Sequence, residues 1–340
     1  MPCLVRPVGS TPSLGDPLVG AYLRFAAARV RSNTLTAQVF DLKVFFTVVP
    51  KAPQQVTVTD VLLFIEAQRA PRRGGNVIRL ADGEAGLAAS TIKRRLATVS
   101  SLFDYLFLRG VCDRNPVPRS LGARHARPDG RGHGGRRGAP LVRAPRKLPR
   151  VLAPAEVSAL TGALRTDRDR AMVALRVHGG LRRCEVLGLR FEHVQVGDRR
   201  VFVADGKGGH QRLVPVADVF FTTLASYLSR ERPAEAVDDH VFVVLKGPNR
   251  GRPLTAAGLD EVMAGARGRA GLSHASCHEL RHTCFTRLRE AGMALEAIQA
   301  QAGHASIETT RVYLHLSNDW LAGEYQRAMA ILDGLHEEEP

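Results

Sequence analysis

The sequence predicts a mainly α-helical protein with one small antiparallel β-sheet, organised in two domains. Apolar residues recur at helical spacing through most of the chain, whereas a β pattern is confined to one short stretch after residue 200. A basic stretch rich in glycine and proline, Arg119–Arg150, separates the two halves. We therefore expect an all-α domain at residues 13–115, a linker at 116–150 and a mainly helical α+β domain at 151–333.

The first half of the chain predicts about four helices. Apolar stripes of helical period mark each of them. The predicted segments are residues 16–30, 34–49, 61–68 and 90–106. Thr59 fits the N-cap of the third helix, and Gly110 fits the end of the fourth. Residues 70–88 are rich in Arg, Gly and Asp and predict a long loop.

The linker is the most basic part of the chain. From Arg119 to Arg150 it carries ten Arg or Lys residues, one acid (Asp129) and six glycines, which supplies net +9 of the total +15. Its prolines and glycines oppose a regular helix, and it has little apolar material to bury. Such a charge excess favours a polyanionic partner, above all nucleic acid phosphates. We expect the linker to lie along a phosphate backbone.

The second half predicts helices around a β-hairpin. Pro154 fits the first position of a helix that continues over residues 155–164, and a second helix ends at Gly179-Gly180. That second helix is predicted at residues 168–178. Two strands follow at 201–203 and 212–216, with a turn between them at 205–210. Beyond Ala217 the pattern is again mostly helical.

Composition excludes several protein classes. No run approaches the ~18–20 consecutive apolar residues of a membrane span, and the first residues lack the pattern of a secretory signal. The five cysteines are scattered without C-x-x-C pairs, which is typical of reduced thiols in a cytosol. We expect a cytoplasmic, nucleoid-associated protein of bacterial or phage origin, without a membrane partner.

The second half also carries residues suited to metal-free DNA cleavage through a covalent intermediate. That chemistry needs a nucleophilic hydroxyl, cations around the phosphate, an acid for the leaving 5′ oxygen and a base or proton shuttle. The candidates follow one another along the chain. They are Arg182 after the Gly-Gly break, Lys207 at the hairpin tip, His278 and Arg281 three residues apart, His304 after a glycine, and Tyr313 nine residues later.

In this order, G-L-R-x-x-E, a hairpin lysine, H-x-L-R-H, G-H and the tyrosine resemble the signature of the tyrosine recombinase (phage integrase) family. All six family positions are filled, and the resemblance covers most of residues 151–333. The first half is more loosely similar to the helical core-binding domain that precedes the catalytic domain in this family. One departure is Cys184, where many members have serine.

The resemblance implies a role for each candidate. Arg182 and Arg281 would bind the non-bridging phosphate oxygens, with a further hydrogen bond from His304. Lys207 would protonate the leaving 5′ oxygen, and His278 would assist proton transfer at the tyrosine. The tyrosine would form a 3′-phosphotyrosyl bond, so rejoining would need no ATP, metal or other cofactor. With an ordinary pKa of about 10, it depends on the cationic cluster to favour its phenolate.

The resemblance also implies partners. These are double-stranded DNA with specific recombination sites, enclosed by both domains in a C-shaped clamp, and three further copies of the chain in a homotetramer. Accessory DNA-bending proteins would complete the assembly. Ser317 or Asn318 can cap a last helix that runs to about Leu332, and its apolar stripe would dock into a neighbouring protomer.

Two other functions fit parts of the sequence. Residues 278–282 also satisfy H-E-x-x-H, the zinc protease motif, with Glu279 as general base. The third ligand would be Glu296, His304 or Glu308. That interpretation leaves Arg182, Tyr313 and the basic linker unexplained and places Arg281 beside the metal. A catalytically inactive DNA-binding protein is the second alternative, although the complete set of six residues argues against it.

Two residues within the motifs receive no catalytic role from the sequence. His282 is expected to pack or bond locally, and Arg183 is expected to face solvent.

Overall fold

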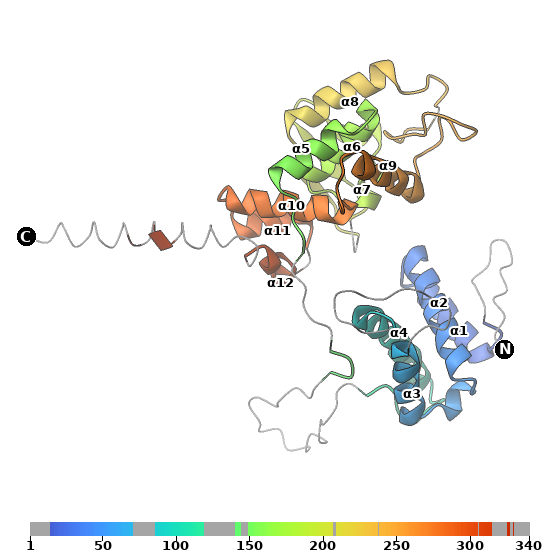
Figure 1. Ribbon diagram of the computed structural model, residues 1–340. Coiled ribbons are helices and arrows are strands. Elements are labelled where there is room, and N and C mark those ends of the chain that lie inside the picture. The colour runs from blue at the N-terminus through green and yellow to red at the C-terminus, as the bar shows by residue number, and fades with distance from the viewer. Residues whose placement is uncertain are drawn as a thin grey trace, which may run out of the picture. The chain divides into compact units, whose positions relative to one another are not determined.

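The computed structural model describes residues 14–70, 86–118, 140–143, 149–206, 209–236, 238–304 and 306–314, with positions 325, 326 and 329 (Figure 1). The chain divides into two compact units, Met1–Arg146 and Lys147–Pro340. Helices dominate both units, and the described sheet is small and antiparallel, so the predicted fold class is confirmed. Most of the predicted linker and of the last predicted helix lies outside the described residues.

The described part of the first unit is all helical (Figure 1, blue to teal). Its elements are α1 (Pro17–Ala27), α2 (Ser32–Val48), the 3-10 turn η1 (Pro53–Gln55), α3 (Val58–Arg69) and α4 (Ala89–Leu108). Their inner faces meet in one apolar core, in which Leu23, Phe45, Phe64 and Phe103 are fully buried. Helix α2 contacts α1, α3 and α4, so it links the other three helices.

Local signals explain where these helices begin and end. Asp16 caps α1 by accepting hydrogen bonds from the backbone N–H groups of Leu18 and Val19. The predicted cap of α3 was wrong: Thr57 rather than Thr59 is the N-cap. Asp60 explains the difference, because its carboxylate bonds back to the Thr57 N–H at 2.9 Å and completes a capping box.

The described part of the second unit combines helices (Figure 1, green to brown) with a three-stranded sheet of order β1-β2-β3. The first elements are α5 (Pro154–Gly162), α6 (Asp167–Val177), α7 (Arg183–Leu187), η2 (Phe191–His193), β1 (Val194–Gln195), β2 (Arg200–Val203) and β3 (Arg212–Pro215). They are followed by α8 (Asp218–Arg230), α9 (Ala256–Arg269), α10 (Cys277–Glu290), α11 (Leu295–Ala302), α12 (Ile307–Thr310) and η3 (Arg311–Leu314). Strands β2 and β3 pair antiparallel with Phe202 opposite Leu213, as the hairpin pattern predicts. The two-residue strand β1 was not predicted.

Helix α6 is the centre of the second unit. Nine of its eleven residues are buried, and it packs against both α8 and α10. Arg176 of α6 is 2% exposed and donates through its Nε to the carbonyl oxygen of Cys277, the first residue of α10, at 3.0 Å. Buried contacts therefore connect the C-terminal end of α6 with the N-terminal end of α10.

No helix in the described ranges is long and apolar enough to cross a membrane.

Candidate active site

The Gly-Gly break after α6 brings the chain close to α10. Gly180 has φ +66°, and a Cβ atom there would lie 2.4 Å from Cζ of Phe285, so both the backbone conformation and the close approach require glycine. Two residues later Arg182 is the N-cap of α7. The break therefore places the Arg182 backbone beside α10.

Arg182 is held in a fixed orientation by two elements. Its guanidinium donates to Oε1 of Glu185 at 2.8 Å and to the carbonyl oxygen of Gly303 at 3.0 Å. Glu185 also accepts the Arg182 backbone N–H at 2.8 Å, which closes the first turn of α7. The Arg182 side chain remains 19% exposed, so its guanidinium is ordered yet accessible.

Glu185 is the buried anion of the site. Both of its oxygens also receive hydrogen bonds from Arg212 of β3, at 3.0 and 2.8 Å. Burial alone would raise the pKa of Glu185, but the bonds from Arg212 and from Arg182 lower it to about 2. Arg212 also donates through its Nε to the carbonyl oxygen of Gln301 at 2.8 Å. Through these contacts Glu185 joins α7, the hairpin and the end of α11.

Arg281 enters the same site from α10. It is 4% exposed and donates to the carbonyl oxygen of Gly180 and, at 2.6 Å, to that of Ala302. Burial, reinforced by the charge of Arg182, lowers the pKa of Arg281 to about 10, which leaves the guanidinium charged at neutral pH. Residues 302 and 303 are adjacent, so the two arginines are bound by neighbouring carbonyl groups.

His304 stands next to both arginines. Its Nε2 lies 3.2 Å from a guanidinium nitrogen of Arg281, and its Nδ1 lies 3.0 Å from the Thr310 hydroxyl. Gly303 before it has φ +60°, and a Cβ atom there would come within 3.0 Å of Arg212. Burial and the nearby cations lower the pKa of His304 to about 4, so the imidazole is neutral at neutral pH.

Tyr313 of η3 is 1% exposed and packs among these groups. Its ring is stacked with that of His304 at a centroid distance of 6.4 Å, and its hydroxyl lies 3.1 Å from Nδ1 of His282. Burial raises the pKa of Tyr313 to about 12, although Arg281 acts to lower it. The expected stabilisation of the phenolate by the cations is therefore outweighed by desolvation in this structure.

The remaining two candidates have different outcomes. His278 is exposed at the start of α10, and its Nε2 lies 2.9 Å from Nε2 of His282. Within the described residues, it is linked to Tyr313 through His282, by the two hydrogen bonds that His282 makes. Lys207 lies outside the described residues, although β2 and β3 on either side of its loop are described.

Three residues of the site received no role from the sequence: Glu185, Arg212 and His282. The glutamate of the R-x-x-E motif was the available signal for Glu185. His282 stands four residues after His278, which places both on one face of α10. Arg212 carries no signal within the strand pattern, because its partners come from α7 and α11. Arg183 pairs with Asp260 at the surface and takes no part in the site.

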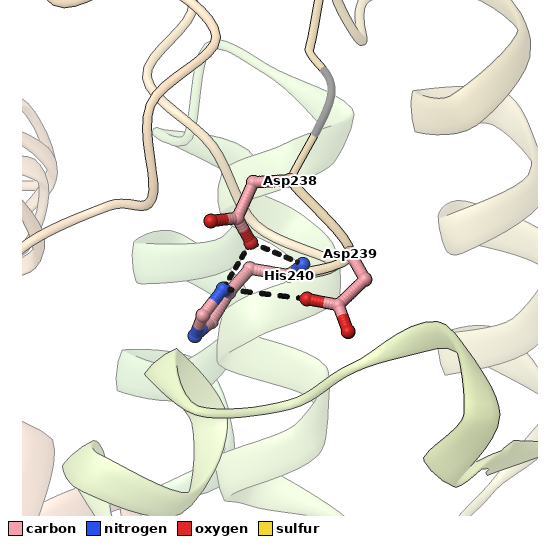
Figure 2. A group of neighbouring side chains, drawn as sticks. All are labelled: Asp238, Asp239 and His240. Carbon is pink, nitrogen blue, oxygen red and sulfur yellow. Dashed lines mark hydrogen bonds and ion pairs between the residues drawn. The ribbon is translucent and has the colours of Figure 1, made fainter.

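The metal-binding alternative is not favoured by the geometry. Glu279, the base it requires, accepts the Ser276 backbone N–H at 2.6 Å and caps α10. Within the described ranges, Asp238, Asp239 and His240 form the cluster whose potential ligand atoms all lie within 4.8 Å of one another (Figure 2). This cluster contains no residue of the H-E-x-x-H motif. Asp238 there accepts the His240 backbone N–H at 2.8 Å, and Asp239 pairs with Arg190.

Known proteins resemble this chain along most of its length. A model described as the phage integrase family matches residues 150–319. The tyrosine recombinase XerC of Serratia marcescens is 28% identical over 322 residues, which cover 93% of this chain and 95% of that protein. The tyrosine recombinase XerC of Yersinia pestis is 31% identical over 249 residues, which cover 72% of this chain and 74% of that protein.

Solved structures show the same fold. The Tn1549 transposon integrase in complex with transposon right end DNA aligns with a TM-score of 0.66 and 18% identity, covering 92% of this chain and 98% of that one. A lambda integrase dimer bound to a COC′ core site aligns with a TM-score of 0.60 and 19% identity, covering 85% of this chain and 94% of that one. The mixed helical architecture with its small sheet is common to all three.

Proposed function

We infer the reaction of this site from the premise that the chain belongs to the phage integrase family. The protein is a tyrosine recombinase, an enzyme of site-specific DNA recombination. Neither the zinc protease nor the inactive DNA-binding protein is supported by the comparisons.

We propose that Arg182, Arg281 and His304 together bind the scissile phosphate. The observation that carries this assignment is that Ala302 and Gly303, adjacent in the chain, hold the two guanidinium groups side by side, with His304 Nε2 3.2 Å from Arg281. Both guanidinium groups are planar and keep N–H groups that these carbonyls do not use. Their geometry matches the oxygens of one phosphate. Because their orientation is set before substrate arrives, they can stabilise the charge that develops during phosphoryl transfer.

The charge balance of the site supports an anionic ligand. Within the described residues that contact one another here, Arg182, Arg212 and Arg281 are balanced by a single carboxylate, Glu185. Burial and the charge of Arg182 both disfavour the charged form of Arg281. A cluster of positive side chains that has fewer negative side chains to balance it is typical of functional sites. A bound phosphate would supply the missing negative charge.

Tyr313 is the proposed nucleophile. Its phenolic oxygen would attack the phosphorus, the bond from phosphorus to the 5′ oxygen would break, and a 3′-phosphotyrosyl bond would form. Lys207 would give a proton to the departing 5′ oxygen. Since the new ester conserves the bond energy, the released 5′ hydroxyl can reverse the reaction without ATP. The hydroxyl of a residue only 1% exposed must become accessible when DNA binds.

The proposed partner is double-stranded DNA with specific recombination sites, bound by four protomers, with accessory DNA-bending proteins where direction must be set. The net charge of +15 supports a nucleic acid partner. The segments expected to track the backbone and to connect protomers, residues 116–150 and 318–332, lie mostly outside the described residues.

The proposal is tested by trapping covalent complexes on DNA. A random-sequence library of duplexes is nicked near the centre, so that cleavage releases a short 5′-hydroxyl fragment and the enzyme remains attached. DNA recovered from denaturant-resistant complexes is then sequenced. We expect one consensus site for the wild-type protein and no covalent complex for Tyr313→Phe. Covalent complexes formed by Tyr313→Phe would contradict the assignment of the nucleophile, and Tyr325 would be tested next.

A further inference from the structure

Three side chains form a hydrogen-bonded row from the interior of the second unit to its surface. Tyr313 is 1% exposed, His282 is half-buried and His278 is exposed. The Tyr313 hydroxyl lies 3.1 Å from Nδ1 of His282, and the opposite ring nitrogen, Nε2, lies 2.9 Å from Nε2 of His278. The row therefore uses both nitrogens of His282, one toward the tyrosine and one toward the exposed histidine.

Proton transfer along such a row depends on the tautomer of its central ring. A neutral imidazole has one N–H donor and one acceptor. When Nε2 of His282 carries the hydrogen, Nδ1 can accept from the tyrosine while Nε2 donates to His278. The opposite tautomer reverses both bonds. Each transfer through the ring therefore converts one arrangement into the other, and no net charge stays on His282.

We propose that His282 is a catalytic proton relay, which takes the proton of Tyr313 during cleavage and passes a proton to His278 and solvent. The inference rests on the proposed role of Tyr313 as the nucleophile. As the phenolic oxygen bonds to phosphorus, its O–H proton moves to Nδ1 of His282, and the Nε2 proton moves to Nε2 of His278. During rejoining the phosphotyrosyl bond breaks and the same row returns a proton to the phenolic oxygen.

The surroundings of His282 favour transfer over storage of the proton. His278, Glu279 and Arg281 face it from α10, Tyr313 faces it from η3, and His304 lies next to Tyr313. Burial, with further contributions from His278 and Arg281, lowers the pKa of His282 to about 4. A proton that arrives from Tyr313 is therefore disfavoured on His282 and is released toward the exposed His278.

Burial also makes a relay necessary. It raises the pKa of Tyr313 to about 12, so the phenolate is rare before substrate binds. A hydroxyl in a side chain 1% exposed has little direct access to water, and its hydrogen-bond partner within the described residues is His282. A correctly positioned general base typically accelerates a reaction that needs such a proton transfer by a factor on the order of 10²–10⁴. The sequence predicted for His282 no role beyond local packing or hydrogen bonding.

The alternative is that His282 only holds Tyr313 in place. Two substitutions separate the roles. The amide of His282→Asn can still hydrogen-bond the hydroxyl from a position close to that of Nδ1, but it cannot accept and pass on a proton. His282→Phe keeps the ring volume and removes the hydrogen bond. His240→Asn, at a histidine within the Asp238–His240 cluster of Figure 2, is the matched control.

The measurement is the single-turnover rate of covalent complex formation on the nicked duplex recovered from the library, between pH 6 and 9. We expect a nearly flat profile for the wild type and for His240→Asn, since His282 stays neutral above its pKa of about 4. His282→Asn and His282→Phe should both be at least a hundredfold slower at pH 7. Their log rates should rise with pH with a slope near 1, because hydroxide must then remove the phenolic proton.

Several outcomes would overturn the relay. Near-normal rates with a flat profile for His282→Asn would show that His282 only positions the tyrosine. In ¹⁵N-histidine NMR of the wild-type protein without DNA, a His282 ring charged at pH 7 would also exclude the relay, whether or not the variants fold. Absence of any covalent complex from the wild-type protein would instead overturn the proposed function itself. Non-covalent binding to the same duplex, expected to change less than twofold, checks that the variants are folded.

Discussion

Arg182 and Arg281 are held by the carbonyl groups of two adjacent residues, Gly303 at 3.0 Å and Ala302 at 2.6 Å. Arg182 is the N-cap of α7 and Arg281 belongs to α10, about a hundred residues further along the chain, yet one peptide segment orients both guanidinium groups. Each keeps N–H groups that are not used by these carbonyls.

The first prediction concerns the shape of the phosphate site. Arg281→Lys preserves the charge but loses the planar fork that bonds Gly180 and Ala302 and faces His304. Single-turnover cleavage should fall about a hundredfold, which corresponds to roughly 3 kcal/mol of transition-state stabilisation. Arg183→Lys, at a surface arginine paired with Asp260, should leave the rate within about twofold. Equal cleavage rates for the two variants would show that Arg281 does not bind the scissile phosphate.

The second prediction concerns Glu185, whose side chain is fully buried between Arg182 and Arg212. Glu185→Gln leaves both guanidinium groups without their anion, so the free energy of unfolding at pH 7 should fall by about 3–5 kcal/mol. Denaturant unfolding measures this loss. Glu192→Gln, whose carboxylate is 72% exposed, is the control and should change stability by less than about 0.5 kcal/mol.

The same carboxylate makes stability depend on pH. The folded-state pKa of Glu185 is about 2, below the ordinary value of 4.5, so its contribution is fully present above pH 4.5 and is lost as pH falls toward 2. The stability difference between wild type and Glu185→Gln should therefore shrink over that range. A difference that stays constant from pH 7 to pH 2 would show that the pKa of Glu185 is the same in the folded and the unfolded protein.

The third prediction concerns the general acid. Lys207→Ala should cleave ordinary DNA at least a hundredfold more slowly. A 5′-phosphorothiolate substrate should restore its rate, because the sulfur leaving group needs no proton. Gel assays of strand cleavage compare the two substrates. If sulfur gives no advantage in the variant, another group is the acid.

Cleavage by the intact enzyme should persist in EDTA, an outcome that a zinc mechanism forbids.

The fourth prediction concerns the basic linker. Replacing Arg131, Arg136 and Arg137 with Ser should weaken binding to cognate and random DNA alike, since phosphate contacts carry no sequence information. Each lost contact should lower the slope of log affinity against log salt by about 0.9. Fluorescence anisotropy over a salt series provides both quantities. A loss confined to the cognate site would mean that these arginines read bases.

Much of the fold could be predicted because its causes are local. Pro154 at the first position of α5 and the alternating residues of β2 and β3 act through neighbours a few residues away. The two-residue strand β1 could not be predicted in this way. Val194 is in a strand only because it pairs with Val201 of β2, which is a tertiary relationship.

The site divides along the same line. Sequence order identified the residue types, and the structure brings Arg182, Arg281, His304 and Tyr313 together around the end of α11. Sequence reasoning did not anticipate that Arg212 would pair with Glu185, because the two come from different elements, 27 residues apart. Likewise, the pattern of α10 placed His282 near His278 but gave no sign of its contact with η3.

By itself, then, the sequence determined which chemical groups this protein has, which helices and strands carry them, and the family to which it belongs. Tertiary structure alone decided their protonation. The pKa of Tyr313 is raised to about 12 rather than lowered by the nearby cations, and that of Glu185 is depressed to about 2. Both values depend on how much water is excluded and which charges approach, and these are properties of packed segments distant in the chain.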